Sequence, residues 1–281
     1  MIRKTLKKLV YGLKTRWHEG GKRQEVLAVD HRVDLLRGGE GPPVVYLHGV
    51  VGETRWYPFH QALASRFDVI APAHPGYGAT EGLSEIDAAE DVVFHYLDLF
   101  EGLGIERAHV VGVSLGGWIA AELAVRHPER IGKLVLADAF GLRLEAEEPG
   151  DPFVRAGDPA ALRDLLFADP SGAMAEILLP AKRPESAEVV AAYGALVEDS
   201  KLARRLRRVT APALVLWGER DRVLSLAYAE AYRDALPNAE LIVIPESGHL
   251  PQFEQGERFA NAVLEFLTRG ERRALKPGSP A

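Results

Sequence analysis

Short runs of apolar residues alternate along the chain with longer stretches in which apolar residues recur every three or four positions. A compact apolar run predicts a strand, and the longer spacing predicts a helix with one buried face. The predicted strands cover residues 24–30, 31–36, 44–47, 67–71, 109–113, 133–137, 213–217 and 240–244. The predicted helices cover residues 55–65, 84–103, 115–127, 225–235 and 251–268. This alternation is typical of a mostly parallel sheet with helices on both faces, and only the first two strands are expected to pair in antiparallel fashion.

The alternation stops between residues 140 and 208, where the sequence contains no convincing strand. One helix is predicted there at residues 159–168, because Asp158 can cap its first turn and Pro159 suits its first position. We therefore expect a helical insertion between the sixth and seventh strands. The rest of the sheet domain is expected to comprise residues 21–139 and 209–269.

The two ends of the chain have patterns of their own. Residues 1–20 predict a basic amphipathic helix, which can pack on its own domain, pair with a twin subunit in a homodimer, or make a peripheral contact with an anionic membrane. Its apolar face consists of Ile2, Leu6, Leu9, Val10, Leu13 and Trp17. Residues 270–281 are predicted to be a disordered tail.

Composition narrows the classes of function. A length of 281 residues with 47% hydrophobic content is sufficient for one large domain. The formal net charge of -6 argues against nucleic acid as a partner and favours a small-molecule substrate. The absence of cysteine excludes disulfides and thiolate nucleophiles. Because no apolar run approaches the roughly 20 residues needed to cross a bilayer, a cytoplasmic location is expected.

The candidate nucleophile is Ser114, which stands in the sequence Gly112-Val113-Ser114-Leu115-Gly116-Gly117 directly after a predicted strand and before a helix. A serine at such a sharp turn is exposed above the sheet, and small neighbours are needed because larger side chains would collide with the adjacent strand and helix. The helix N-terminus also favours negative charge. The N–H of Leu115 is therefore a candidate donor to an oxyanion.

The candidate base follows by elimination among the nine histidines. Only His127 and His249 come after Ser114, and His127 lies at the far end of the helix that carries the serine away from the sheet edge. His249 follows the last predicted strand in a loop at a carboxyl strand end, where the catalytic groups of open α/β sheets gather. Serine needs such a base because its hydroxyl is too weakly acidic near neutral pH.

The base in turn needs a carboxylate that fixes its tautomer. Asp221 is expected in this role, since it lies in the loop after the strand at 213–217 and gives the chain order Ser, Asp, His. Asp138, directly after the preceding strand, is the rival. Ordinary surface ion pairing would be the alternative explanation for Asp221, which has charged neighbours.

A second oxyanion donor is expected in the loop His48-Gly49-Val50-Val51-Gly52-Glu53, where the glycines allow the backbone to turn inward. The N–H of Val50 is the first choice, and Val51 is the alternative. His48 is expected to be a structural histidine that bonds to the backbone of the loop.

These segments together resemble the α/β-hydrolase superfamily, in its carboxylesterase-like and carbon–carbon hydrolase-like branches. The resemblance extends from about residue 24 to residue 268 and adds the segment His74-Pro75-Gly76-Tyr77-Gly78 to the motifs above. It implies an eight-stranded sheet, a helical cap at residues 140–208, and no cofactor or metal. His74 departs from the aspartate that is frequent in the family, and Ser114 disfavours the branches that use a carboxylate nucleophile.

The predicted activity is hydrolysis of a small to medium hydrophobic ester through an acyl-enzyme. The apolar residues proposed for its pocket are Phe140, Phe153, Phe167, Met174, Leu178, Tyr193 and Leu250. One alternative is hydrolysis of a carbon–carbon bond in a ring-cleavage product, whose acidic group would need an arginine such as Arg155, Arg163 or Arg183. Another is a non-catalytic binding protein with this fold, although the expected mark, a missing triad member, is absent.

Overall fold

The computed structural model describes residues 20–53, 55–145, 147, 149–150, 158–172 and 187–270. The predictions of a helix at the N-terminus and of a disordered tail lie outside these residues, except for their border positions 20 and 270. Five predicted residues of the substrate site also lie outside them: Phe153, Arg155, Met174, Leu178 and Arg183. None of the helices in the described part combines the length and apolar character that a membrane span requires.

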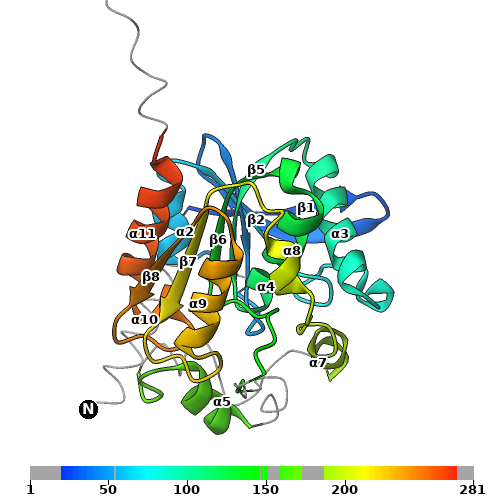
Figure 1. Cartoon of the computed structure of the whole chain (residues 1–281). Helices are drawn as coiled ribbons and strands as arrows, with labels where there is room; N and C mark the ends of the chain where they lie inside the picture. Colours follow the sequence, from blue (N-terminus) through cyan, green and yellow to red (C-terminus); the bar gives the residue numbers. More distant parts are fainter. Residues whose placement is uncertain are drawn as a thin grey trace, which may run out of the picture.

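One eight-stranded sheet forms the centre of the molecule, with the strand order β1-β2-β4-β3-β5-β6-β7-β8 (Figure 1). β2 is antiparallel to β1 and to β4, and all other neighbours are parallel. The predicted fold class is thus confirmed, and the sheet is mixed at one edge. The strands are Lys22–Ala28 (β1), His31–Gly38 (β2), Pro43–Leu47 (β3), Asp68–Pro72 (β4), Ala108–Val113 (β5), Ile131–Ala137 (β6), Ala213–Gly218 (β7) and Ala239–Ile244 (β8).

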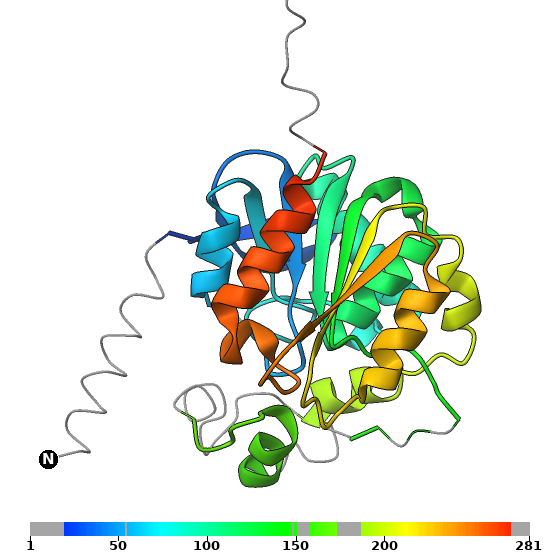
Figure 2. The same cartoon turned by 60° about the vertical axis from the view of Figure 1, so that its left-hand side comes forward.

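Helices cover both faces of the sheet. One face is covered by α2 (Pro58–Leu63) and α11 (Gly256–Thr268), and the other by α3 (Ala89–Gly102), α4 (Leu115–Arg126) and α9 (Leu226–Ala235), as Figures 1 and 2 show. Short 3-10 turns occur at Leu83–Glu85 (η1) and Pro128–Arg130 (η2). Double coverage explains why the central strands are continuous apolar runs, in which all six residues of β7 are buried.

The insertion after β6 is helical in its described parts. α5 (Pro159–Leu166) and α7 (Ala187–Gly194) lie beyond the carboxyl ends of the strands, and α8 (Leu202–Leu206) packs against α4 and α9 (Figure 2). The predicted cap of α5 is present, because the carboxylate of Asp158 accepts hydrogen bonds from the N–H groups of Ala160 and Ala161. The insertion therefore faces the sheet edge at which β3, β5, β6, β7 and β8 end.

Three predicted helices differ from the structure in where they start or in their continuity. The helix expected from residue 84 begins only at Ala89, because the side chain of Asp91 accepts hydrogen bonds from the N–H groups of Asp87 and Ala88 and so caps the helix there. The helix expected from residue 251 is interrupted after α10 (Pro251–Glu254) by Gln255, which has extended φ and a non-helical ψ of 46°. The helix expected at residues 55–65 is shorter and starts at Pro58.

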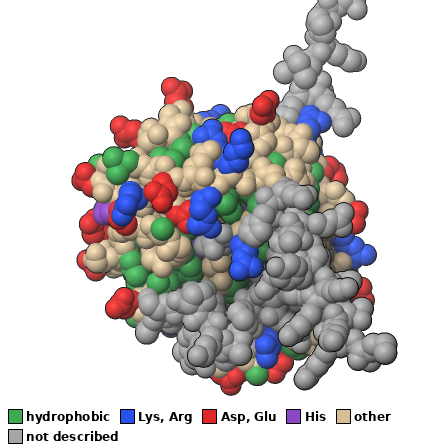
Figure 3. Space-filling model, turned by 180° about the vertical axis from the view of Figure 1, so that it is seen from behind, with side chains coloured by type: hydrophobic (Ala, Val, Ile, Leu, Met, Phe, Trp, Pro, Cys, Tyr) green, Lys and Arg blue, Asp and Glu red, His purple; other side chains and the backbone are tan. Residues whose placement is uncertain are grey.

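Charged side chains of both signs are interspersed on the face that Figure 3 shows. Ion pairs among the described residues include Arg37 with Asp68 at 2.6 Å and Arg269 with Glu240 at 2.8 Å. Such a mixture is what an acidic protein without a dominant basic surface is expected to have.

Candidate active site

Ser114 occupies a strained turn between β5 and α4. Its φ of 54° and ψ of −116° lie in a region that non-glycine residues rarely adopt. A Cβ on Gly112 would lie 2.2 Å from the carbonyl oxygen of Gly116, and a Cβ on Gly116 would lie 2.1 Å from that of Leu47. The glycines are therefore required sterically, because the turn presses the start of α4 against its own strand and against β3.

His249 lies in the loop between β8 and α10 and has no solvent exposure. Its Nε2 is 2.8 Å from Oγ of Ser114. Its main-chain N–H donates to the carbonyl oxygen of Leu166 at 2.9 Å, so the last turn of α5 helps to hold the loop. The structure thus brings together two residues that are 135 positions apart in the sequence.

Asp221 lies in the loop after β7, and its Oδ2 is 2.8 Å from Nδ1 of His249. Its Oδ1 accepts hydrogen bonds from the N–H groups of Val223 at 2.7 Å and Leu224 at 3.1 Å. The side chain is fully buried, and the partial exposure of the residue comes from its main chain. A carboxylate can only accept a hydrogen bond, so Nδ1 of His249 carries the proton. Nε2 is then the acceptor that faces the hydroxyl of Ser114.

Asp138 stands beside this set without a hydrogen bond to His249. Its Oδ1 accepts the N–H of Gly218 at 2.8 Å, and its Oδ2 has no hydrogen-bond partner among the described residues. Burial, together with the neighbouring charge of Asp221, raises the pKa of Asp138 well above its ordinary value. The residue that contacts the imidazole is therefore Asp221.

The spacing of Asp138, Asp221 and His249 would also suit a cation, since one potential ligand atom of each lies within 4.8 Å of the others. However, both imidazole nitrogens of His249 are already engaged, one by Asp221 and one by Ser114. The geometry fits a hydrogen-bonded chain better than a metal site.

The first turn of α4 supplies main-chain donors next to Ser114. The N–H of Gly116 donates to the carbonyl oxygen of His48, whereas the N–H of Leu115 has no partner within the part of the chain that the structure describes. The loop after β3 lies opposite, and the carbonyl oxygen of Val50 accepts a hydrogen bond from the hydroxyl of Tyr77 at 3.1 Å. The N–H groups of Leu115 and Val50 remain the predicted donors to an oxyanion at Ser114.

Two histidines hold this loop in place. Nδ1 of His48 bonds the carbonyl oxygen of Gly49 at 2.7 Å, and its Nε2 accepts the N–H of His74 at 3.1 Å. His74 in turn bonds the carbonyl oxygen of His48 through Nε2, at 2.8 Å, and the hydroxyl of Tyr96 through Nδ1. Burial lowers the pKa of His48 to about 4 and that of His74 well below its ordinary value. Both are thus neutral hydrogen-bonding groups, and His74 has a structural role even though it departs from the family's usual aspartate.

The described residues of the predicted pocket occupy different places. The ring of Phe140 meets the imidazole of His249 edge-on, with 5.7 Å between the ring centroids. Leu250 follows His249 in the sequence, and Phe167 follows Leu166, whose carbonyl oxygen accepts the N–H of His249; both residues are buried. The hydroxyl of Tyr193 donates to the carbonyl oxygen of Pro75 at 3.1 Å, and its ring centroid lies 6.2 Å from that of Tyr77.

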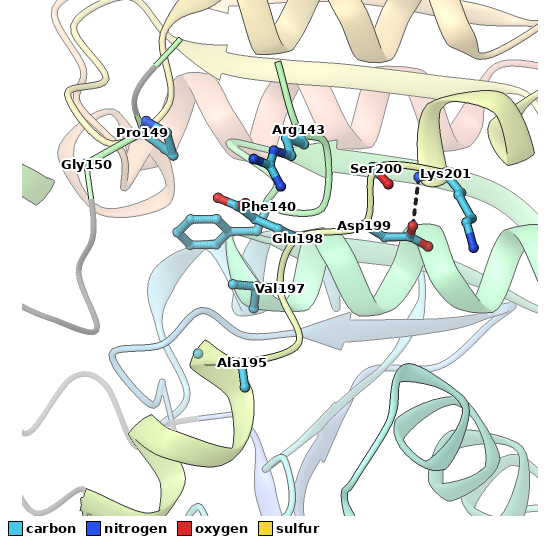
Figure 4. Close-up of a pocket in the computed structure, with 11 residues that line it drawn as sticks. Phe140, Arg143, Pro149, Gly150, Ala195, Val197, Glu198, Asp199, Ser200 and Lys201 are labelled. Carbon is cyan, nitrogen blue, oxygen red and sulfur yellow. Dashed lines mark hydrogen bonds between the residues drawn. The ribbon is translucent and has the colours of Figure 1, made fainter. Parts of the chain in front are cut away.

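A cavity of about 540 Å³ opens beside Phe140, between the segment after β6 and the segment after α7. Figure 4 shows Phe140, Arg143 and Val197 along this cavity, with Lys201 farther from the ring. The N–H of Lys201 donates to the carboxylate of Asp199 at 2.7 Å. The cavity has both apolar and charged walls, and its charged residues were not singled out from the sequence.

Two carboxyl groups near the site, the buried Glu53 and the partly buried Glu254, were also missed. Glu53 bonds Tyr46 and Gln252, and Glu254 accepts hydrogen bonds from the N–H groups of Gly248 at 2.6 Å and Ala168 at 2.8 Å. The only available signal was their proximity in sequence to the loops of His48 and His249.

Residues 44–262 match the family model described as the alpha/beta hydrolase family. The dihydrolipoyllysine-residue acetyltransferase component of the acetoin cleaving system of Pseudomonas putida is 34% identical over 245 residues, which are 83% of this chain but only 65% of that protein. The 2-hydroxymuconate semialdehyde hydrolase of Pseudomonas sp. strain CF600 is 31% identical over 90% of this chain and 96% of its own.

Among solved structures, the 2-hydroxy-6-oxo-6-phenylhexa-2,4-dienoate hydrolase from Rhodococcus sp. strain RHA1 superposes with a TM-score of 0.75 at 25% identity, over 88% of this chain and 98% of that one. The family model covers the Ser114 turn, the Asp221 loop and His249 together. The chain therefore belongs to the alpha/beta hydrolase family.

Proposed function

We propose that the protein is a serine hydrolase that cleaves a small to medium hydrophobic carboxylic ester through an acyl-enzyme. The observation that carries this proposal is the continuous chain from Ser114 through His249 to Asp221, with 2.8 Å at each step. Nucleophile, base and orienting carboxylate in this order are what nucleophilic acyl transfer requires.

In the proposed reaction, Nε2 of His249 takes the proton of Ser114 while Oγ attacks the ester carbonyl carbon. Asp221 stabilises the resulting imidazolium, and the N–H groups of Leu115 and Val50 bind the oxyanion. His249 then gives its proton to the departing alcohol as the carbon–oxygen bond breaks. Water, activated by the same imidazole, attacks the acyl-enzyme, and its transferred proton returns to Oγ of Ser114 as the acid leaves. Loss of one oxyanion donor typically lowers kcat by about 10²- to 10³-fold.

The preference for a neutral acyl group rests on the surroundings of His249. The ring of Phe140 contacts its imidazole, and the neighbouring residues Phe167 and Leu250 are buried. Apolar walls with a few polar groups at the reacting centre are typical of sites for hydrophobic ligands. The cap proposed for residues 140–208 would supply the remaining wall.

The second candidate function is hydrolysis of a carbon–carbon bond in a ring-cleavage product. It is favoured by a specific observation, because the relative at 31% identity over most of both chains is named as a 2-hydroxymuconate semialdehyde hydrolase. The same three side chains would serve, but an acidic substrate would need a cation near the site. Arg163 on α5 is half-buried and is the candidate within the described residues.

The two functions can be separated by turnover of p-nitrophenyl esters of graded acyl length, compared with a ring-cleavage dienone, for the wild type and Ser114→Ala. We expect ester turnover in the wild type, with short to medium neutral acyl groups preferred, and almost none in Ser114→Ala. The second function would be established by two results together. The wild type would have a higher kcat/KM for the dienone than for every ester, and Arg163→Ala would lose dienone turnover while it keeps ester turnover. Equal rates in the wild type and Ser114→Ala would contradict both.

A further inference from the structure

Glu53 is a buried carboxyl group at the edge of the candidate active site. It lies four positions after Gly49 and is only 3% exposed. Within the described residues, no lysine or arginine forms a salt bridge with it. A buried carboxyl group without a cation is costly unless its oxygens accept several hydrogen bonds.

The donors to Glu53 come from two segments of the site. The hydroxyl of Tyr46, in β3, donates to Oε2 at 2.7 Å. The side-chain amide of Gln252, in α10 directly behind His249, donates to Oε1 at 2.9 Å. The main chain of Gly49 lies close to Oε1 and lowers the pKa of Glu53. Glu53 therefore joins β3, the loop that carries Val50, and the helix that follows the base.

Gly49 is the point at which this network reaches the nucleophile. A Cβ on Gly49 would lie 3.3 Å from Cβ of Ser114 and 3.6 Å from Oε1 of Glu53. The loop thus passes between the serine and the carboxyl group in close contact with both. A displacement of the Glu53 carboxyl group would therefore disturb the packing of this loop against Ser114.

We propose that Glu53 is a positioning residue whose carboxylate holds the Gly49–Val50 turn against Ser114 and couples it to the helix behind His249. The inference rests on the proposed function. The ionised group accepts hydrogen bonds from both Tyr46 and Gln252, whereas the protonated group carries an O–H that competes with one of them. Protonation should therefore loosen the turn and remove a negative charge that favours the imidazolium of His249.

The protonation state of Glu53 changes in an accessible range of pH. Burial raises its pKa to about 7, although the hydrogen bonds from Tyr46 and Gln252 lower it. The titratable groups that face it are Tyr46 in β3, Tyr57 before α2, and His249 in the loop after β8. Both tyrosines have pKa values above their ordinary value and stay neutral. Glu53 is thus expected to contribute an inflection near pH 7 to the pH dependence of the reaction.

The test is the rate of phosphonylation of Ser114 by a fluorophosphonate, measured from pH 5 to 9 for the full chain, because this readout does not depend on the natural substrate. Glu53→Gln keeps the size of the side chain but cannot ionise. We expect Glu53→Gln to be labelled roughly ten- to a hundredfold more slowly than the wild type at pH 8, as for a displaced catalytic group. Its curve of labelling rate against pH should also lack the inflection near pH 7. With an ester substrate, kcat should fall while KM changes little.

Two further variants make the test specific. Tyr46→Phe removes one hydrogen bond but keeps the carboxyl group, so the inflection should move to higher pH. Glu122→Gln removes another buried glutamate, which is 1% exposed and bonds Arg126 on α4, and should leave the profile unchanged. A Glu53→Gln profile identical to that of the wild type, or an equal effect of Glu122→Gln, would overturn the inference.

Failure of the proposed function would be visible separately, as absence of labelling at Ser114 in the wild type. The positioning role would then be read from amide hydrogen exchange of the segment 47–53, which should be faster in Glu53→Gln than in the wild type and in Glu122→Gln. Unchanged exchange would overturn the inference without reference to activity.

Discussion

Asp221 accepts a 2.8 Å hydrogen bond from Nδ1 of His249, although Asp138 lies beside it at the end of the neighbouring strand. The loops after β7 and β8 are joined by the bonds from the N–H of Glu219 to the carbonyl oxygen of Ile244 and from the N–H of Arg220 to that of Ser247. These bonds place Asp221 opposite the imidazole. Asp138 points its Oδ1 at the N–H of Gly218 instead.

The two aspartates should therefore differ in their effect on catalysis. Asp221→Asn removes the acceptor that fixes the tautomer of His249 and should lower kcat by about 10³- to 10⁴-fold. Asp138→Asn keeps an acceptor for Gly218 and should retain most of the activity. Matched kinetics on one p-nitrophenyl ester would measure both, and the reverse ranking would assign the orienting role to Asp138.

The turn at Ser114 should not tolerate a methyl group on its glycines. In Gly116→Ala the new Cβ would lie 2.1 Å from the carbonyl oxygen of Leu47, so β3 or α4 would have to shift. We expect a loss of about 3 kcal/mol or more in the free energy of unfolding, as for overpacking of a rigid core. Urea denaturation followed by circular dichroism would measure it.

Gly256→Ala is the matched control, because a Cβ there meets nothing within 4 Å and the residue begins α11. It should be neutral or stabilising by up to about 1 kcal/mol, as expected when alanine replaces glycine in a helix. Equal destabilisation by both substitutions would mean that steric contact is not what restricts Gly116.

The buried histidines should make the fold sensitive to acid. Burial lowers the pKa of His48 to about 4 and that of His60 to about 3, and the pKa of His74 is also well below its ordinary value. The unfolded chain binds protons at these groups below about pH 6.5, so the stability that they contribute above that pH is lost as the pH falls through the folded values. With three such groups, the free energy of unfolding should fall by roughly 4 kcal/mol per pH unit between about pH 5.5 and 4.5.

Glu53 acts in the opposite direction and offsets part of this slope. Its pKa is raised to about 7, so its contribution to stability is lost as the pH rises towards 7. Urea denaturation at a series of pH values would measure the net slope. Nδ1 of His60 accepts the N–H of Tyr57 at 3.1 Å, and in His60→Asn the amide oxygen can replace it. The slope of the free energy of unfolding against pH should then fall by the contribution of one titrating group. An unchanged slope would show that His60 does not contribute.

Glu254 should connect the insertion to the loop of His249. Its carboxylate accepts hydrogen bonds from the N–H groups of Gly248, Ala168 and Asp169. Glu254→Ala should lower the free energy of unfolding by about 2 to 4 kcal/mol, because several main-chain donors lose a charged acceptor. It should also increase proteolysis near residues 158–172. Glu257→Ala, which changes an exposed glutamate of α11, is the control, and equal proteolysis of the two variants would contradict this role.

The local pattern was sufficient for most of the sheet. Continuous apolar runs identified the six strands from β3 to β8, and two further strands were expected where β1 and β2 lie. The turn of Ser114 was recognisable because glycine spacing after a buried strand is a local property of the chain. His249 could be selected because its rivals lie on the wrong side of Ser114 or far along α4. The starts of α3 and α11 were wrong, since they depend on where Asp91 and Gln255 place the backbone.

The sequence by itself determined the fold class and a short set of candidate residues, because strand periodicity and tight turns follow from neighbouring residues. Only the tertiary structure decided between Asp221 and Asp138, since both follow adjacent strands and only the direction of each side chain separates them. It also revealed the environment of Glu53, whose bond to Gln252 spans 199 positions. Contacts of this kind depend on packing between distant segments, and burial, which shifts the pKa of a group, exists only after those segments have met.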